Sequence, residues 1–178
     1  LKKTSLNDKL QTLIEENSIK KSNIDNITGI KLKNIQKNII NNNEIKYSTL
    51  SVDIDRDKKT VTITIQAPVN KAPSKIEDIL SQGDDFWLLR CARELDDAIL
   101  HLRFNELEIG IILFKTKGEI ANVLSYDKIF EIFENDWFIK EVSFYWSRVF
   151  KRIDLTSRTL ITLIEPGSCY AGFLCELI

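Results

Sequence analysis

The run from Ile109 to Phe114 is almost wholly apolar and is too short to be a buried helix. Such runs are typical of strands buried on both faces, as in parallel sheets. A second run of this kind extends over residues 158–164, and apolar residues at helical spacing fill residues 88–102 and 135–152. The alternation of helices and buried strands predicts an α/β fold.

Residues before this region alternate with a period of two. Thr60, Thr62 and Thr64 alternate with apolar residues, and a similar pattern covers residues 47–54. Because a short polar turn separates the two segments, they predict a β-hairpin. Further helices are predicted near residues 119–133 and from Ala171 onward, and the helix over 88–102 is expected to begin at Asp84-Asp85.

The N-terminal part of the chain has a different composition. Residues 1–46 contain nine Lys and five acidic residues, a net charge of +4 within a chain whose total is −1. A short amphipathic helix is predicted at residues 5–16, followed by a polar connector at 17–44. We expect residues 1–44 to be a helix and linker, and residues 45–178 to form the folded unit.

Composition excludes several classes of protein. A net charge of −1 gives no electrostatic basis for binding nucleic acid or an anionic membrane, and no apolar run is long enough to span a bilayer. Three Cys and a single His101 form no disulfide set or metal-ligand spacing, so we expect reduced thiols, a cytoplasmic protein and no metal. The chain has no Met and stops within an apolar segment, which predicts an interior piece of a longer polypeptide.

The turn from Glu165 to Gly172 is the strongest candidate for chemistry. Its small residues would let backbone N–H groups, in particular those of Ala171 and Gly172, point at an oxygen that carries negative charge. Such donors make up an oxyanion hole. The alternative is a glycine-containing connection that only lets a helix pack closely on the sheet.

Three side chains around this turn could take part in a reaction. Glu165 and Glu176 could serve as acid and base, or could be exposed or ion-paired carboxylates, with Arg158 or Arg152 as partners for Glu165. Cys169 could be a nucleophile, but the sequence places no base beside it, so a small buried thiol is the favoured interpretation.

Three segments together resemble the crotonase superfamily, and within it the benzoyl-CoA-dihydrodiol lyases: ARELDDAILHLRFNELEIG (92–110), DLTSRTL (154–160) and EPGSCYAG (165–172). The resemblance extends over about residues 29–178 and implies a crotonase-like spiral of β-β-α units. It also implies a second unit of a two-unit chain, preceded by a linker and truncated at its C-terminus.

The resemblance implies an activity for the longer chain. These lyases convert 2,3-epoxy-2,3-dihydrobenzoyl-CoA to 6-oxohex-3-enoyl-CoA and formate in aerobic benzoate degradation, without metal, flavin or nicotinamide. The implied partners are the acyl-CoA substrate, the first unit of the same chain and a second copy in a homodimer.

One segment departs from the crotonase pattern. Active units carry an oxyanion donor in a Ser/Ala-Gly-Ala/Asn loop after the first apolar strand, where this chain has Lys115 to Glu119. The resemblance therefore implies that one donor is absent, and that Gly172 and Glu176 mark the place of the other donor and of a catalytic Glu. Two alternatives stay open: a non-catalytic scaffold, or a generic enoyl-CoA hydratase or isomerase.

Overall fold

The structure is a computed structural model that describes residues 3–21 and 29–178. The chain divides into two compact units, Leu1–Lys31 and Leu32–Ile178. The first unit contains α1 (Lys3–Lys21), on which Leu6, Leu10 and Ile14 are exposed. The predicted helix is confirmed and is longer than expected, and residues 22–28 of the predicted connector lie outside the described residues.

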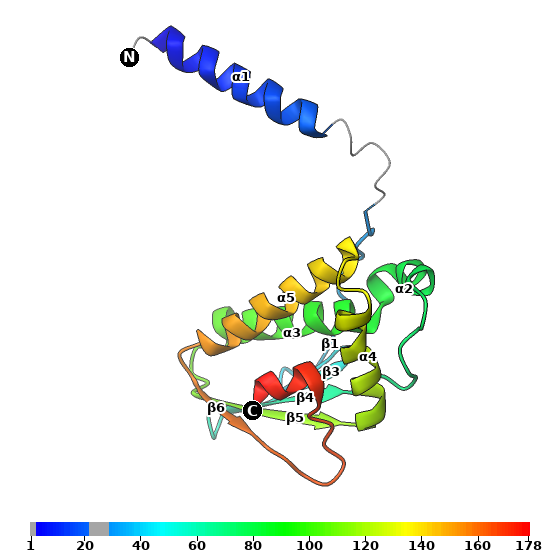
Figure 1. Ribbon diagram of the computed structural model, residues 1–178. Helices are drawn as coiled ribbons and strands as arrows, with labels where there is room; N and C mark the ends of the chain where they lie inside the picture. The colour runs from blue at the N-terminus through cyan, green and yellow to red at the C-terminus, as the bar shows by residue number, and fades with distance from the viewer. Residues whose placement is uncertain (1–2, 22–28) are drawn as a thin grey trace. The chain divides into compact units, whose positions relative to one another are not determined.

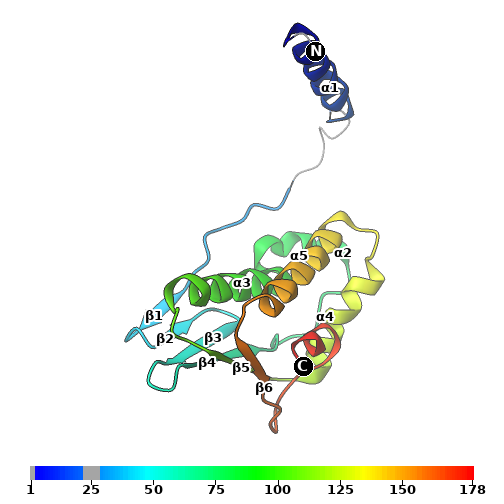
Figure 2. The same ribbon diagram turned by 90° about the vertical axis from the view of Figure 1, so that its left-hand side faces the viewer.

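The second unit is built on a six-stranded mixed sheet. Its strands are β1 (Asn38–Ile40), β2 (Glu44–Lys46), β3 (Leu50–Asp55), β4 (Thr60–Gln66), β5 (Ile111–Lys117) and β6 (Thr159–Thr162). They lie side by side in chain order, antiparallel from β1 to β4 and parallel from β4 to β6 (Figure 2). The predictions of an α/β fold, a β3–β4 hairpin and two parallel strands are confirmed. The prediction that both parallel strands are buried was wrong, because β5 buries only alternate residues and β6, at the edge of the sheet, has no buried residue.

The prediction of a polar connector over residues 17–44 was wrong at its C-terminal end. The polar sequence around Asn41 and Asn42 was interpreted as connector, but it forms the turn between β1 and β2. Both residues adopt positive φ angles of 50° and 53°, a conformation that Asn tolerates better than most residues. The anchor of this hairpin is Ile45, which is 1% exposed and pairs with Val52 of β3.

The helices predicted near residues 88–102, 119–133 and 135–152 are present, whereas the helix over 76–82 was not predicted and the helix expected from Ala171 onward is a 3₁₀ helix. The helices of this unit are α2 (Ile76–Gln82), α3 (Trp87–Asn105), α4 (Ile120–Ile132) and α5 (Trp137–Asp154), with 3₁₀ helices η2 (Gly83–Asp85) and η3 (Gly172–Leu177). Asp84 and Asp85 belong to η2, so α3 begins later than expected at Trp87. The side chain of Asp136 caps α5 by accepting from the backbone N–H of Phe138 at 2.9 Å.

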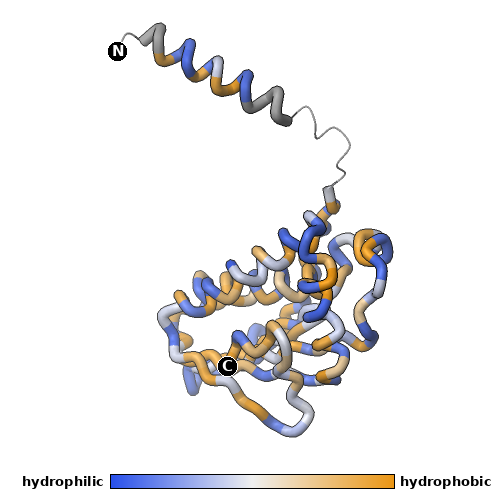
Figure 3. The backbone as a smooth tube through the Cα atoms, in the orientation of Figure 1, coloured by the Kyte–Doolittle hydropathy of each residue, from blue (hydrophilic) through white to orange (hydrophobic). Residues whose placement is uncertain are grey.

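The helices lie on one face of the sheet (Figures 1 and 2). The alternate residues Val61, Ile63 and Ile65 of β4 have no exposed surface and form the floor of the core. Leu95 and Ile99 of α3, also fully buried, lie above this floor. α5 packs beside α3 on the same face of the sheet (Figure 2), and hydrophobic and hydrophilic residues alternate along the helices of this unit (Figure 3).

Reciprocal arginines join the ends of α3 and α5. Arg103 of α3 donates to the carbonyl oxygens of Arg152 and Leu155 at 3.2 and 3.3 Å. Arg158, which follows α5, donates to the carbonyl oxygens of Leu102 and Glu106 at 2.8 and 2.9 Å. The carbonyl oxygens at the C-terminal end of each helix thus accept from an arginine: those of α5 from Arg103, and those of α3 from Arg158.

Within residues 32–178, the opposite face of the sheet carries no helix (Figure 2). β6 is the last strand, and near its end Ile161 and Ile164 are 39% and 66% exposed. In the part of the chain that the structure describes, no helix is both long and apolar enough to cross a membrane.

Candidate functional site

The three loops that follow the parallel strands meet at one edge of the sheet. Because β4, β5 and β6 run in the same direction, their carboxyl ends come together. The backbone N–H of Ala67, after β4, donates to Lys117 O at 2.8 Å, and the N–H of Gly118, after β5, donates to Gly167 O at 3.2 Å. The loops are therefore tied to one another through their own peptide groups.

The segment after β5 is where the resemblance places the first oxyanion donor. In the structure this segment packs closely against the loop that follows β4. Gly118 has a φ angle of +131°, and a Cβ atom there would lie 2.5 Å from the Cβ of Ala67. Only glycine fits a position with this angle and this approach. Since the N–H of Gly118 is already bonded to Gly167, this segment offers no open donor at that position.

The turn after β6 satisfies its amides in the same way. The hydroxyl Oγ of Ser168 accepts from the N–H of Glu165 at 2.9 Å, while the N–H of Ser168 donates to Glu165 O at 2.9 Å. The N–H of Cys169 donates to the hydroxyl of Thr116 at 2.8 Å. The small residues of this turn thus allow close packing on β5.

The second predicted donor lies at the start of η3. Gly172 has a φ angle of +51°, and a Cβ atom added there would lie 2.7 Å from the Cβ of Asp127 and would overlap its Cγ. The next N–H, that of Phe173, donates to Asp127 Oδ1 at 2.8 Å. A carboxylate of α4 therefore lies against Gly172 and accepts from the N–H of the residue after it. The role of Ala171 and Gly172 as donors stays a prediction.

The structure places the two predicted catalytic carboxylates in different surroundings. Glu165 is 53% exposed and accepts from Lys115 Nζ at 3.1 and 3.2 Å. The suggested arginine partners were wrong, because Arg158 bonds backbone carbonyls and Arg152 pairs with Asp96. Both arginines lie near the amino end of β6, whereas Glu165 lies beyond its carboxyl end.

Glu176 is exposed and lies along an open groove between α4, α5 and η3. The aromatic residues of this groove are Phe130, Trp146, Phe150 and Phe173. Glu165 lies in the turn before η3 and does not line the groove. No role of Glu165 or Glu176 in catalysis follows from these contacts, and both stay predictions.

The cysteines favour a structural interpretation. Cys91 and Cys169 are buried without exposed surface, and burial raises the pKa of both thiols, that of Cys91 to about 12. A thiol with a raised pKa is a poor nucleophile at neutral pH. The only His, His101, lies 3.0 Å through Nδ1 from the side-chain nitrogen of Asn105 on the same helix.

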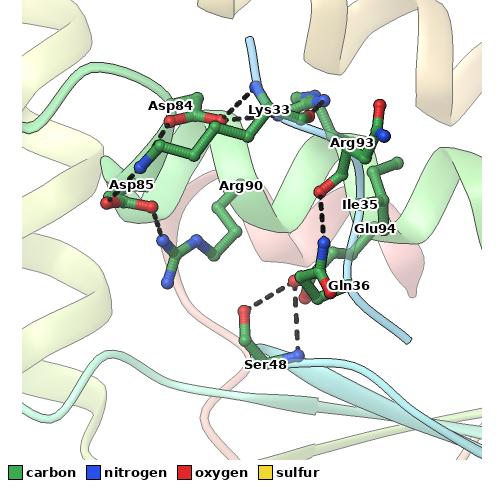
Figure 4. A pocket seen from close by; sticks show the side chains of 10 residues that line it. Lys33, Ile35, Gln36, Ser48, Asp84, Asp85, Arg90, Arg93 and Glu94 are labelled. Carbon is green, nitrogen blue, oxygen red and sulfur yellow. Dashed lines mark hydrogen bonds and ion pairs between the residues drawn. The ribbon is translucent and has the colours of Figure 1, made fainter. Parts of the chain in front are cut away.

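Sequence reasoning missed a polar cleft beside α3 (Figure 4). The buried carboxylate of Asp84 accepts from the backbone N–H of Lys33 at 2.7 Å and pairs with Arg93 at 3.3 Å. That hydrogen bond and the charges of Lys33 and Arg93 lower the pKa of Asp84. Asp85 pairs with Arg90. The hydrogen bond and the paired charges thus hold the segment around Lys33 against η2 and α3.

Glu94 in the same cleft is a charged residue of α3 that is only 4% exposed. Its carboxylate accepts from the hydroxyl of Ser48 at 2.6 Å, and from the N–H and hydroxyl of Thr49 at 2.7 and 2.5 Å. These contacts fix the turn that leads into β3. The only sequence signal for this contact was the pair Ser48-Thr49 directly before β3, since two adjacent hydroxyl donors beside a strand call for an acceptor.

No group of three or more His, Cys, Asp or Glu in the described ranges could hold a metal ion. The described features define a mixed α/β unit whose parallel strands end in an interlocked set of turns. No family model matches the chain.

Comparison with curated proteins points to a particular enzyme. Over 149 residues, or 84% of this chain, the sequence is 39% identical to benzoyl-CoA-dihydrodiol lyase of Aromatoleum evansii. The resemblance predicted from the three sequence segments is therefore confirmed. The matched region spans 27% of that lyase, so the chain corresponds to about a quarter of the relative's length.

Proposed function

We propose that this chain is a supporting, crotonase-type unit of a longer lyase that opens the ring of 2,3-epoxy-2,3-dihydrobenzoyl-CoA. The products would be 6-oxohex-3-enoyl-CoA and formate, formed in the cytoplasm without a resident cofactor. The observation that carries the proposal is the 39% identity to a lyase of which the chain matches 27%.

The geometry favours a structural role for this unit over a catalytic one. Catalysis on a thioester needs donors that are free to stabilise the developing charge on its carbonyl oxygen. Here the N–H of Gly118 is bonded to Gly167 O, and the carboxylate of Asp127 lies against Gly172, where the resemblance places the second donor. The lyase chemistry would then belong to another part of the longer polypeptide, and this unit would contribute packing and homodimer contacts.

The lyase activity is tested with the longer polypeptide that contains this segment. When it is given 2,3-epoxybenzoyl-CoA, we expect stoichiometric release of formate, measured with a formate dehydrogenase assay. Absence of formate from a folded preparation would refute the lyase assignment. Hydration of crotonyl-CoA by the same preparation would favour the hydratase alternative instead.

The supporting role is tested in the same polypeptide with Glu165→Gln and Glu176→Gln. Because neither carboxylate touches an open donor, we expect each variant to retain kcat to within about twofold. Glu108→Gln, another exposed carboxylate of this unit, is the matched control. A loss of kcat of about a hundredfold or more in either variant, with an unchanged melting temperature, would show that this unit is catalytic.

A further inference from the structure

We propose that the free edge of β6 is a docking site for a β-strand from another part of the longer polypeptide. β6 is the last strand of the sheet and pairs on one side only, with β5 (Figure 2). The N–H of Thr159 donates to Gly110 O at 3.0 Å. The N–H of Leu163 donates to Phe114 O at 2.9 Å, so this pairing continues just beyond the last residue of β6. The inference rests on the proposed function, because it names the surface through which the supporting unit joins the rest of the lyase.

The other edge of β6 presents unpaired backbone groups. In a parallel ladder the N–H and C=O of one residue point toward the neighbouring strand, and those of the next residue point away from it. Those of Leu160 and Thr162 therefore point away from β5, and within residues 32–178 they form no backbone hydrogen bond. Such a row of donors and acceptors is the template on which an added strand is recognised.

The sequence of this edge lacks the features by which edge strands ordinarily resist pairing. Those features include charged side chains, proline and short length. Residues 159–164 (TLITLI) contain no charged residue and no proline. The charges that flank them are engaged elsewhere, because Arg158 donates to carbonyl oxygens at the end of α3 and Glu165 pairs with Lys115. By contrast β1, at the other edge of the sheet, is only three residues long and directly follows Lys37.

The side chains of β6 indicate the kind of strand that fits beside it. Leu160 is in register with the buried Ile112, on the face that carries the helices, and is 37% exposed. Ile161 is on the opposite face and is 39% exposed. A neighbouring strand with apolar residues on both faces would bury both side chains, as in the interior of a parallel sheet.

The length of the related lyase indicates where this strand comes from. The matched region spans 27% of that protein, so most of its length lies outside the match. A strand from the same polypeptide is held close to β6 by the chain itself, whereas a strand from a second copy has to be bound from solution. The occupant we assign is therefore a strand of the longer polypeptide.

The experiment compares amide hydrogen exchange in the 178-residue chain and in the longer polypeptide that contains it. Both are kept at about 1 μM, a concentration that disfavours weak association between copies. We expect Leu160 and Thr162 to exchange at least about tenfold more slowly in the longer polypeptide. Thr159 and Leu163, which already bond to β5, are the internal controls, and their protection in the 178-residue chain shows that the sheet is formed there.

Two variants of the longer polypeptide separate β6 from the opposite edge of the sheet. Ile161→Lys places a charge on β6 and should raise exchange at Leu160 and Thr162 to the rates of the 178-residue chain. Ile39→Lys is the matched control, since it makes the same change at an isoleucine of β1 that is 51% exposed. It should leave exchange at β6 unchanged.

Two results would overturn the inference. One is equal exchange of Leu160 and Thr162 in the 178-residue chain and in the longer polypeptide. The other is protection that appears in the longer polypeptide only when its concentration is raised, because the occupant would then be a second copy. Neither readout depends on formate release, so failure of this inference and failure of the lyase assignment are distinguishable.

Discussion

Two glycines at the carboxyl edge of the sheet are required for different physical reasons, one for its backbone angle alone and the other also for lack of space. Gly167 has a φ angle of +88°, and a Cβ atom added there would meet nothing within 4 Å, so only its backbone angle disfavours other residues. Gly172 combines a positive φ angle with the close approach of Asp127. The two positions therefore form a natural pair for separating strain from overlap.

We predict that Gly172→Ala lowers the free energy of unfolding by about 2–4 kcal/mol, whereas Gly167→Ala lowers it by about 1 kcal/mol. The larger loss reflects the displacement of Asp127 and η3 in addition to backbone strain. Urea unfolding measures both, with Gly110→Ala as control because Gly110 has open space and no positive φ angle. Equal losses at 167 and 172 would contradict the assigned overlap.

At the level of elements, the reciprocal arginines couple α3 to α5. Arg158→Met should lower the free energy of unfolding by about 1–3 kcal/mol, since it leaves the carbonyl oxygens of Leu102 and Glu106 without their charged donor. Thermal unfolding is the measurement. Lys140→Met, at an exposed position of α5, should stay within about 0.5 kcal/mol of the unchanged chain, and a similar loss there would argue against the capping role.

Two aspartates on different elements should respond to pH with opposite sign. The pKa of Asp84 is lowered, first by the backbone N–H of Lys33, so its stabilisation is present above the unfolded value near ~3.9 and is lost as pH falls through the lower folded pKa. The pKa of Asp53 is raised, first by burial and then by Glu44 on the neighbouring strand. Its ionisation therefore costs stability as pH rises above that unfolded value.

We accordingly predict that Asp84→Asn is destabilising and Asp53→Asn stabilising at pH 7. Both differences should shrink as the pH falls, and that of Asp84 should shrink last, because its lowered pKa keeps the folded carboxylate ionised to lower pH. Urea midpoints measured from pH 3 to pH 7 test the pair. Two shifts of the same sign at pH 7 would refute the assignment.

The elements were predicted where a local pattern encodes them. The alternation around Thr60–Thr64 and the helical spacing from Leu88 to Leu102 report burial directly, and both elements are present. The β1–β2 hairpin was missed because Asn41 and Asn42 resemble polar linker when the partner strand is unknown. Its pairing with β3 is a tertiary contact, which periodicity within the segment does not express.

The sequence indicated which segments form the candidate site, but not the contacts that their side chains and peptide groups make. The turn at 165–172 and the departure at Lys115–Glu119 both lie where the sequence indicated, at the carboxyl ends of parallel strands. The hydrogen bond from the N–H of Phe173 to Asp127 could not be predicted, because the two residues are 46 positions apart in the sequence. The exposed carboxylate Glu165 likewise took the nearest cation across the sheet, Lys115, and not one nearby in sequence.

At the scale of the whole molecule, the helices within residues 32–178 cover only one face of the sheet (Figure 2). Parallel sheets are ordinarily covered on both faces, and a terminal strand with apolar residues is a pairing site for another chain. We predict that the 178-residue chain self-associates with rising concentration in sedimentation velocity, and that Ile161→Lys on β6 reduces this association at least about threefold. Leu107→Lys, 76% exposed in the loop before β5, is the control. Equal effects of the two changes would show that β6 is not the contact.

The interlocked turns after β4, β5 and β6 have a consequence for how natural selection acts on this unit. Where peptide groups bind their own chain, substitutions near Gly118 or Asp127 change how much folded protein accumulates. On the proposed function, a saturation mutagenesis survey of the longer enzyme would divide into two phenotypes. Changes in this unit would lower abundance in the cell at constant turnover per molecule, and changes in the reacting unit would lower turnover at constant abundance.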